Sequence, residues 1–366
     1  MKRSPKRRPC AIKPLRIVSI GGGTGLSCLL SGLKHYARPD LVDPSVRRQE
    51  LSADTRIEIT AVVTVTDDGG SSGRLRRDFD VLPPGDIRNC MVALSEDEAL
   101  LSRLFQYRFD AGRGLKGHSF GNLFLTALTR ITGDFAHAIK LSSEVLASSG
   151  RIFPSTAKNV VIEAGLEDGS TVSGETRISR SKIRIREIRI KPRNPLPLPE
   201  TLQAIAEADL ITLGPGSLYT SIVPNMLVRG IPEAIERSGA VKAYFCNLMW
   251  QPGETMNFRA SDHVEAIHKH AGLPFLDYVV VNARPIGTTA RRRYAAQKVK
   301  PVEVDRRRLE DMGLCIVEVD MLARTEKVRH DSHAAAAVAI RLAMAGNRLR
   351  ERARSASLKT GAKSVL

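Results

Sequence analysis

Two glycine-rich segments of this chain have the residue types that bind phosphate groups. Residues 21–25 read Gly-Gly-Gly-Thr-Gly, and residues 214–217 read Gly-Pro-Gly-Ser. Each segment follows a short apolar run and precedes a helical pattern, so its backbone N–H groups are expected at a helix N-terminus, where unpaired donors and the helix dipole favour an anion. The candidate ligand-binding residues of these segments are Gly22, Gly23, Thr24, Gly25, Gly214, Gly216, Ser217 and Tyr219.

Neither segment matches a standard nucleotide-binding motif. The third glycine of the dinucleotide fingerprint GxGxxG is missing, because Leu26 or Cys28 occupies its position. No Gly-Lys-Ser/Thr follows, which excludes a P-loop. Plain turns, with a serine capping the helix after the second segment, remain the alternative interpretation.

A third candidate region joins carboxylates to hydroxyls, an amide and arginines. It comprises Asp67, Asp68, Ser71 and Ser72 at the end of a β-branched run, and Asp86, Arg88 and Asn89 in the turn Pro-Pro-Gly-Asp-Ile-Arg-Asn. Carboxylates at a strand end are expected to hold Mg²⁺ through water or to bind a sugar or base, and arginines favour phosphate. Zinc is not expected, since no histidines or cysteines cluster here. Helix capping by Asp68 and Asp86 is the alternative.

Residues 117–122, Gly-His-Ser-Phe-Gly-Asn, place an imidazole and an amide at a predicted helix start. They include the Gly-x-Ser-x-Gly spacing of serine hydrolases, but they follow no strand and lack the strand-turn-helix context of a nucleophile. We therefore expect His118 and Asn122 to contact a ligand or cap the helix, and we assign no catalytic residue.

The elements that must position these loops alternate between strands and helices. Strands are predicted at residues 16–20, 57–66, 208–213, 241–246, 277–281 and 315–320, and helices at 26–33, 91–109, 120–132, 134–147, 261–272 and 331–345. This order predicts an α/β fold with a Rossmann-like, doubly wound, mostly parallel sheet. Ligands bind such sheets beyond the carboxyl ends of the strands, where the candidate loops lie.

Residues 151–199 have a different pattern. Alternation at residues 160–163, 171–178 and 183–190 predicts a small antiparallel β insertion, whose arginines at residues 179–189 are expected to form a solvated edge. The folded domain is predicted to span residues 16–345. Residues 1–15 and 346–366 are predicted to be basic, disordered tails.

The charge of the chain is concentrated at its ends. Of the net charge of +17, residues 1–16 carry seven Lys or Arg and no acid, and residues 347–366 carry six Lys or Arg and one acid. Because the remaining body is only mildly basic and aromatic residues make up 5% of the chain, nucleic-acid binding is not expected. No apolar run suits a signal peptide or membrane insertion, and five scattered cysteines predict a reduced, cytoplasmic protein.

In this order, the motifs resemble the gluconeogenesis factor family, the CofD-like relatives of 2-phospho-L-lactate transferase. The segments that carry the resemblance are residues 20–26, 66–76, 83–89, 117–122, 214–221, 251–255 and 328–331, and the similarity spans residues 16–342. The resemblance implies a CofD-like fold that binds a UDP-sugar, in particular UDP-N-acetylglucosamine, and a role in cell shape and peptidoglycan precursor supply during gluconeogenic growth. It implies that Tyr294 and Arg329 contact the ligand and that Asp67 and Asp68 form the pocket floor.

Three functions are weighed against one another. The first is a nucleotide-sugar-binding regulator without an established reaction. The second is a Mg²⁺-dependent transferase of phosphorus-containing groups, favoured by Asp67, Asp68 and Asp86. The third is an interaction protein whose basic tails recruit an anionic partner. A homo-oligomer is compatible with each of them.

Overall fold

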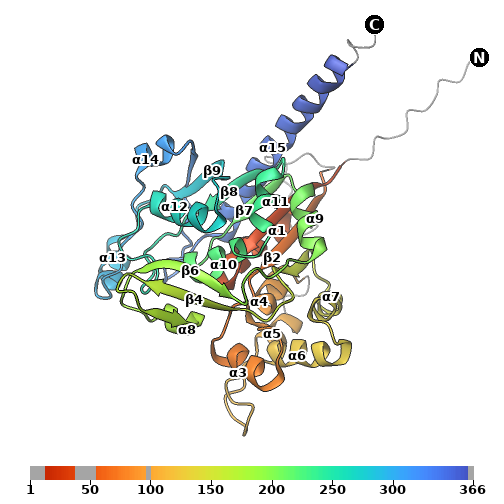
Figure 1. Cartoon of the computed structure of the whole chain (residues 1–366), viewed down its shortest axis with the longest axis vertical. Coiled ribbons are helices and arrows are strands. Elements are labelled where there is room, and N and C mark those ends of the chain that lie inside the picture. The colour runs from red at the N-terminus through yellow and green to blue at the C-terminus, as the bar shows by residue number, and fades with distance from the viewer. Residues whose placement is uncertain (1–12, 38–54, 96–99, 362–366) are drawn as a thin grey trace, which may run out of the picture.

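Seven parallel strands form a sheet at the centre of the molecule (Figure 1). The structure, a computed structural model, describes residues 13–37, 55–95 and 100–361, with side chains up to residue 348. In spatial order the strands are β3 (Arg151–Pro154), β2 (Ile57–Val63), β1 (Leu15–Gly21), β7 (Leu210–Leu213), β8 (Val241–Phe245), β9 (Tyr278–Asn282) and β10 (Cys315–Val319). Every neighbouring pair is parallel, which confirms the predicted doubly wound sheet.

The order of strands reverses beside β1. From β1 the chain adds β2 and then β3 on one side, and it later returns to place β7 against the other side of β1. The register pairs Ile20 with Leu213, so the loops after β1 and β7 leave the same edge of the sheet next to each other. Such a reversal is the place where open α/β sheets bind ligands.

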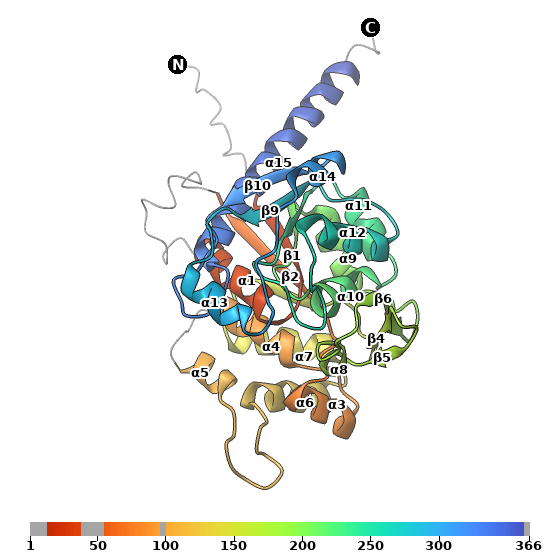
Figure 2. The same ribbon diagram turned by 90° about the vertical axis from the view of Figure 1, so that its left-hand side faces the viewer.

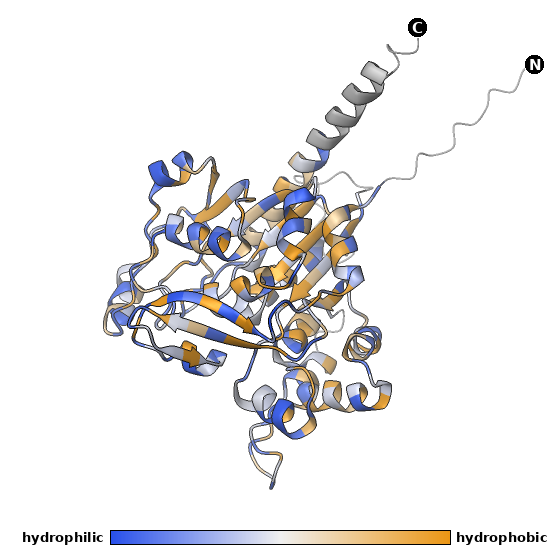
Figure 3. Cartoon of the chain, viewed as in Figure 1, coloured by the Kyte–Doolittle hydropathy of each residue, from blue (hydrophilic) through white to orange (hydrophobic). Residues whose placement is uncertain are grey.

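Helices cover both faces of the sheet. On one face lie α1 (Gly23–Ala37), α4 (Gly85–Leu94) and α15 (Ser332–Gly361), and on the other lie α9 (Pro199–Glu207), the π-helix η2 (Leu218–Ile222), α10 (Val223–Met226), α11 (Ile231–Arg237) and α12 (Ala260–Ala271). Side chains of β1 contribute to the apolar cores on both faces of the sheet: Leu15 and Ile17 belong to one core, and Val18 and Ile20 belong to the other. Figure 3 shows this as apolar residues gathered on the central strands.

A further group of helices lies below the sheet in Figure 2. It consists of α3 (Gly70–Phe79), α5 (Leu101–Gln106), α6 (Phe120–Thr132) and α7 (Phe135–Val145). The prediction of one helix over residues 91–109 is wrong. Helix α4 ends at Leu94, because Ser95 turns to an extended conformation and its N–H bonds to the Val92 carbonyl.

The antiparallel insertion is confirmed and is smaller than predicted. It contains β4 (Val161–Leu166), β5 (Thr171–Ser173) and β6 (Ile185–Lys191) in the order β5-β4-β6. Residues 151–154 belong to the central sheet instead, and the strand predicted over residues 171–178 ends at Ser173. Gly174 adopts a φ of +93°, which favours glycine, and helix α8 (Glu175–Ile178) follows.

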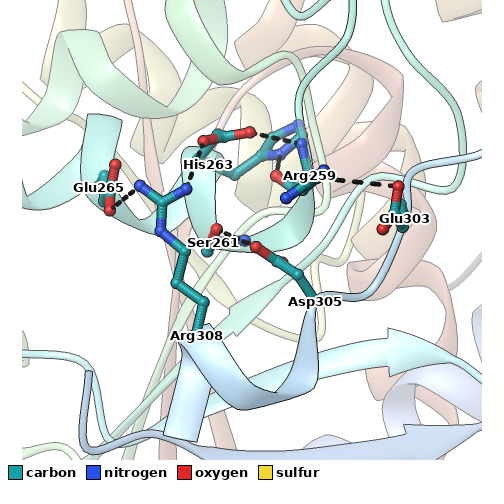
Figure 4. A network of polar contacts seen from close by, with 8 residues as sticks. Arg259, Ser261, His263, Glu265, Glu303, Asp305 and Arg308 are labelled. Carbon is teal, nitrogen blue, oxygen red and sulfur yellow. Dashed lines mark hydrogen bonds and ion pairs between the residues drawn. The ribbon is translucent and has the colours of Figure 1, made fainter. Parts of the chain in front are cut away.

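A network of polar contacts connects the first turns of α12 with α14 (Arg306–Asp311) and the residues just before it, as Figure 4 shows. Ser261 donates its hydroxyl to the Asp305 carboxylate. Arg308 lies 2.6 Å from a carboxylate oxygen of Glu265 and 3.4 Å from one of Asp262, both on α12. The remaining helix, α13 (Thr288–Ala295), packs against a small satellite core that includes Leu248.

The two ends of the chain differ from each other. Residues 1–12 of the predicted N-terminal tail lie outside the described residues, and β1 begins at Leu15. Helix α15 continues to Gly361, past the predicted end at residue 345, so it departs from the expectation of a disordered tail from residue 346. The alanine, leucine and arginine residues that follow position 345 are strong helix formers, which accounts for the extension. No helix within the described ranges is long and apolar enough to cross a membrane.

Candidate functional site

The two glycine-rich loops meet on one cavity of about 320 Å³ at the point where the strand order reverses. We call these loops, residues 21–25 and 214–217, the glycine cradle. Of the predicted residues, those that line the cavity are Gly22, Gly23, Thr24, Gly25, Gly216, Ser217 and Arg329. Helix α1 begins at Gly23, so backbone N–H groups of its first turn lie at the cavity wall.

Close contact between the two loops requires glycine at particular positions. A Cβ atom at Gly25 would overlap the carbonyl oxygen of Pro215, and one at Gly22 would lie 2.6 Å from an Asp86 carboxylate oxygen. Any larger residue at Gly25 would therefore separate the loops. Gly214 and Tyr219 do not line the cavity: Gly214 forms the turn, with a φ of +74°, and Tyr219 is buried in the core behind it.

The wall next to the second glycine loop comes from the loop after β8. The Gln251 side chain donates to the Ser217 hydroxyl over 2.9 Å and accepts from Asn247 over 3.0 Å. These bonds fix an amide pair beside the cradle, and Trp250 lines the same wall. Sequence reasoning missed these three residues as site residues, although residues 251–255 belong to a segment that carries the family resemblance.

The segment before α15 completes the cavity. Arg329 is exposed and lines the wall, while the His330 ring nitrogen Nε2 lies 3.1 Å from the Cys246 carbonyl oxygen. Burial lowers the pKa of His330 to about 4, so this imidazole is neutral at pH 7. Tyr294 lies behind the wall: its hydroxyl accepts from the Val328 N–H over 3.3 Å. It positions the segment that carries Arg329, and it is not among the residues that line the cavity in the described part of the chain.

Five carboxylates gather beside the cradle, beyond the end of β2. This acidic corner consists of Asp67, Asp68, Asp86, Glu175 and Glu254. Asp86 accepts a hydrogen bond from the Gly23 N–H, so it touches the first turn of α1. Asp68 accepts from the Thr176 N–H at 2.9 Å, and Glu254 accepts from the Tyr219 N–H at 3.0 Å.

The acidic corner retains protons at neutral pH. Burial and the neighbouring Asp67 raise the pKa of Asp86 to about 7. Burial, together with Asp86 and Asp67, raises the pKa of Glu175 to about 9. Burial also raises the pKa of Glu254. Like charges brought together in this way are typical of functional sites.

The predicted hydroxyl and imidazole residues hold helices together. The Ser71 hydroxyl lies 3.0 Å from Nδ1 of His118, and the Asn122 amide donates to the Ser72 hydroxyl over 3.3 Å. Both contacts join α3 to the start of α6. Burial and the nearby Arg74 lower the pKa of His118. None of these four residues lines the cradle cavity among the described residues.

Arg88 and Asn89 lie on a second cavity, of about 580 Å³, which adjoins the first. We call it the cationic cavity. Its walls are Thr24, Ser27, Cys28, Ser31, Lys34, Arg88, Asn89, Val92, Ala93, Ser102, Gln106, Arg108 and Arg329. Thr24, Cys28 and Arg329 line both cavities. The structure therefore distributes most of the predicted site residues over three adjoining places: the cradle, the acidic corner and the cationic cavity. Ser71, Ser72, His118 and Asn122 lie outside them, between α3 and α6.

The fold and the cavity at the reversal of strand order define a Rossmann-like, doubly wound α/β protein with a switch-point pocket. Comparison with known proteins identifies its relatives. A family model described as 2-phospho-L-lactate transferase CofD matches residues 17–322. The gluconeogenesis factor of Bacillus subtilis is 45% identical over 328 residues, which cover 89% of this chain and 98% of that protein. The gluconeogenesis factor of Halalkalibacterium halodurans is 45% identical over 88% of this chain and 94% of that protein.

Solved structures show the same relationship. A crystal structure of a protein from Bacillus halodurans superimposes with a TM-score of 0.82 at 44% identity, covering 90% of this chain and 99% of that one. A second crystal structure of that protein, described as a UPF0052 family member, also gives 0.82 at 43% identity and covers 90% of this chain and 100% of that chain. The chain belongs to the gluconeogenesis factor family of CofD-like proteins.

Proposed function

We propose that the glycine cradle binds a nucleotide-sugar, UDP-N-acetylglucosamine or another UDP-sugar, and that the protein is a cytoplasmic regulator of cell shape and peptidoglycan precursor supply during gluconeogenic growth. The observation that carries the proposal is the convergence of two glycine loops from adjacent strands on one cavity at the switch point. The diphosphate lies at the first turn of α1, where backbone donors and the helix dipole stabilise it.

The remaining walls suit the other parts of the ligand. Arg329 lines the cavity from the segment before α15, beside Cys28 of α1, and pairs with a phosphate. The amides of Gln251 and Asn247 and the Ser217 hydroxyl offer hydrogen bonds to sugar or base oxygens. Trp250 supplies an apolar surface beside them.

Thermal unfolding with UDP-N-acetylglucosamine tests the proposal. A ligand present at about 100 times its Kd stabilises the folded state by about 2.7 kcal/mol, so the melting temperature rises with concentration. Arg329→Gln is expected to weaken binding about tenfold, since it removes a charge-assisted hydrogen bond. Arg324→Gln is the control, because Arg324 is exposed and lines none of the cavities described above. An unchanged melting temperature at millimolar ligand would contradict the proposal.

The second candidate function is a Mg²⁺-dependent transfer of a phosphorus-containing group. The acidic corner favours it, because Asp86 touches the same helix start as the cradle. Among the described residues no group of three His, Cys, Asp or Glu is arranged to hold a metal ion. Mg²⁺ often takes only one or two carboxylates besides phosphate oxygens, so Asp67 and Asp86 are the residues that would hold it. The ion would neutralise charge on the transferred phosphate.

Product formation with Mg²⁺ tests this second candidate. If it is correct, a substrate-linked product appears with the ion and disappears in Asp67→Asn, while Asp78→Asn on the exposed side of α3 retains it. Asp68 is held by the Thr176 N–H and hydroxyl, which both donate to Oδ1, whereas Asp67 accepts only the Gly69 N–H among the described residues. A product that persists in Asp67→Asn would remove this carboxylate from the reaction.

A further inference from the structure

We propose that the cationic cavity is a second anion-binding site, separate from the glycine cradle, and that it takes the phosphate group of a small, non-aromatic, hydroxylated molecule. Its volume of about 580 Å³ is within the range of small-molecule pockets, which is about 300–1,000 Å³. The proposal does not depend on which nucleotide the cradle binds.

Three arginines reach this cavity from three separate parts of the chain. Arg88 comes from the first turns of α4, Arg108 from the loop after α5, and Arg329 from the segment before α15. None of the described residues that line the cavity is acidic. Guanidinium groups bind phosphate oxygens in pairs of parallel hydrogen bonds, so their convergence favours a phosphate.

Arg88 is held with part of its hydrogen-bonding capacity unused. Its Nη2 donates to the Asn89 side chain over 2.6 Å, but its Nε is buried and has no hydrogen-bond partner within the described residues. Burial and the nearby Arg108 lower the pKa of Arg88. Asp67 and Asp86 act in the opposite direction but less strongly than Arg108, so an anion between Arg88 and Arg108 would offset the mutual repulsion of the two arginines.

Local packing holds Arg88 in this position. A Cβ atom at Gly121 would lie 2.9 Å from Cγ and Cδ of Arg88 and 2.8 Å from the Phe105 carbonyl oxygen. The glycine at the start of α6 therefore leaves room for the Arg88 stem to pass toward the cavity.

The chemical character of the other lining residues indicates what the rest of the ligand is. The hydroxyls of Thr24, Ser27 and Ser31 on α1, with the side-chain amides of Asn89 and Gln106, offer hydrogen bonds to hydroxyl groups. No described lining residue is aromatic, so a nucleobase has no ring to stack on, in contrast to the cradle cavity with Trp250. These walls favour a phosphorylated polyol over a nucleotide.

The two cavities share a wall. Arg329, Thr24 and Cys28 line both of them, so a ligand in one cavity changes the position or the charge balance of a residue used by the other. Binding at the two places is therefore expected to be coupled, and the coupling is reciprocal.

Calorimetric titration of the full chain with inorganic phosphate and with glycerol 2-phosphate tests the proposal. Both probes bind the wild type, and glycerol 2-phosphate binds more tightly because of its hydroxyls. Arg108→Gln lowers the affinity at least about tenfold, because a charge-assisted hydrogen bond is lost, and it leaves the cradle intact since Arg108 lines only the cationic cavity. Arg103→Gln, on the exposed side of α5, is the matched control and leaves the affinity unchanged.

The outcomes separate this proposal from the proposed function. Equal affinity in Arg108→Gln and Arg103→Gln would place the phosphate in the cradle and overturn the second site. Absence of binding of both probes to the wild type would overturn it as well. Phosphate binding that persists in saturating UDP-N-acetylglucosamine supports two sites. Arg88→Gln is expected to weaken phosphate binding as Arg108→Gln does, when the variants are compared at equal thermal stability. If UDP-N-acetylglucosamine fails to bind while phosphate binds through Arg108, only the proposed function fails.

Discussion

Helices α12 and α4 both begin among charged residues, but the signs of the neighbouring charges differ between them. At α12, Arg308 pairs with Glu265 and Asp262, and Asp305 accepts from Ser261 (Figure 4). At α4, the largest charge effect on Asp86 comes from the like-charged Asp67, and the largest on Arg88 from Arg108, although Asp86 and Arg88 also attract each other. Pairs of opposite charge stabilise the contact between α12 and α14. Repulsion between like charges at α4 raises the energy of the folded protein, and such an arrangement is typical of functional sites.

The largest expected effect is a fall in the free energy of unfolding as the pH rises and the carboxyls of the acidic corner lose their protons. Asp86 and Glu175 have folded pKa values of about 7 and about 9, above the ordinary values of 3.8 and 4.5. A raised pKa contributes stability that is complete below the ordinary value and is lost as pH rises through the folded value. Together these two shifts correspond to a fall of about 6 kcal/mol in the free energy of unfolding between pH 5 and pH 8.

Urea denaturation at both pH values measures this difference. In Glu175→Gln the decrease is expected to be clearly smaller, because one titrating group is removed and its neighbours repel less. Glu144→Gln on the exposed side of α7 is the control and keeps the wild-type decrease. Equal slopes in the two variants would show that the acidic corner is relaxed in solution, and the contrast with α12 would be lost.

A second prediction concerns the packing that directs Arg88. Gly121→Ala places a methyl group against the Arg88 stem and the Phe105 carbonyl, so we expect a loss of about 2 kcal/mol in unfolding free energy. Phosphate affinity is expected to fall with it, since the guanidinium is displaced. Denaturation and phosphate titration of the same variant measure both quantities. Unchanged phosphate binding would mean that the position of Arg88 does not matter to the cationic cavity.

A third prediction tests the polar contact between α12 and the residues before α14. Ser261→Ala removes the hydroxyl that donates to Asp305, and we expect a loss of about 1 kcal/mol, as for other contacts at a helix start. Ligand affinity is expected to stay at the wild-type value, because this network lies outside the cavities described above. A change in affinity for phosphate or UDP-N-acetylglucosamine would contradict the view that the contact between α12 and α14 is structural and separate from the ligand cavities.

The smallest effect is expected from Arg308→Ala. Its partners Glu265 and Asp262 are partly exposed, and exposed ion pairs are weak and screened by salt. We expect a small fall in melting temperature at low salt, which disappears at high salt, and no change in ligand binding. A large fall that persists at high salt would mean that the pairing at α12 contributes more than its exposure indicates.

The sequence predicts six of the seven central strands, because they are apolar runs, and β1, β2 and β7 are followed by glycine-rich loops. The exception is β3, whose residues the sequence assigns to the antiparallel insertion. The sequence also places the two glycine loops together, since both follow parallel strands. The local errors lie where a single residue changes the backbone direction. Ser95 ends α4 and Gly174 ends β5, and neither position is distinguished by the apolar pattern around it.

The candidate site was predictable as a set of loops but not as separate cavities. Arg88 and Asn89 lie two and three residues after Asp86, yet the helix turn directs them to the cationic cavity while Asp86 faces the acidic corner. Glu175 and Glu254 join that corner from segments distant in sequence, so no spacing rule indicates them. Such groupings depend on side-chain direction, which the order of motifs does not contain.

The packing of α15 has a consequence for how the protein is synthesised. Ala335, Ala339 and Ala343 of this last helix belong to the same core as Leu15 and Ile17 of the first strand. More than 300 residues separate these two parts of the chain, so the ribosome must synthesise all of them before α15 can join α1 in covering this face of β1. Until then the nascent chain exposes an apolar surface, and completion of the core is a late event that makes an incomplete chain prone to aggregation and to recognition by chaperones.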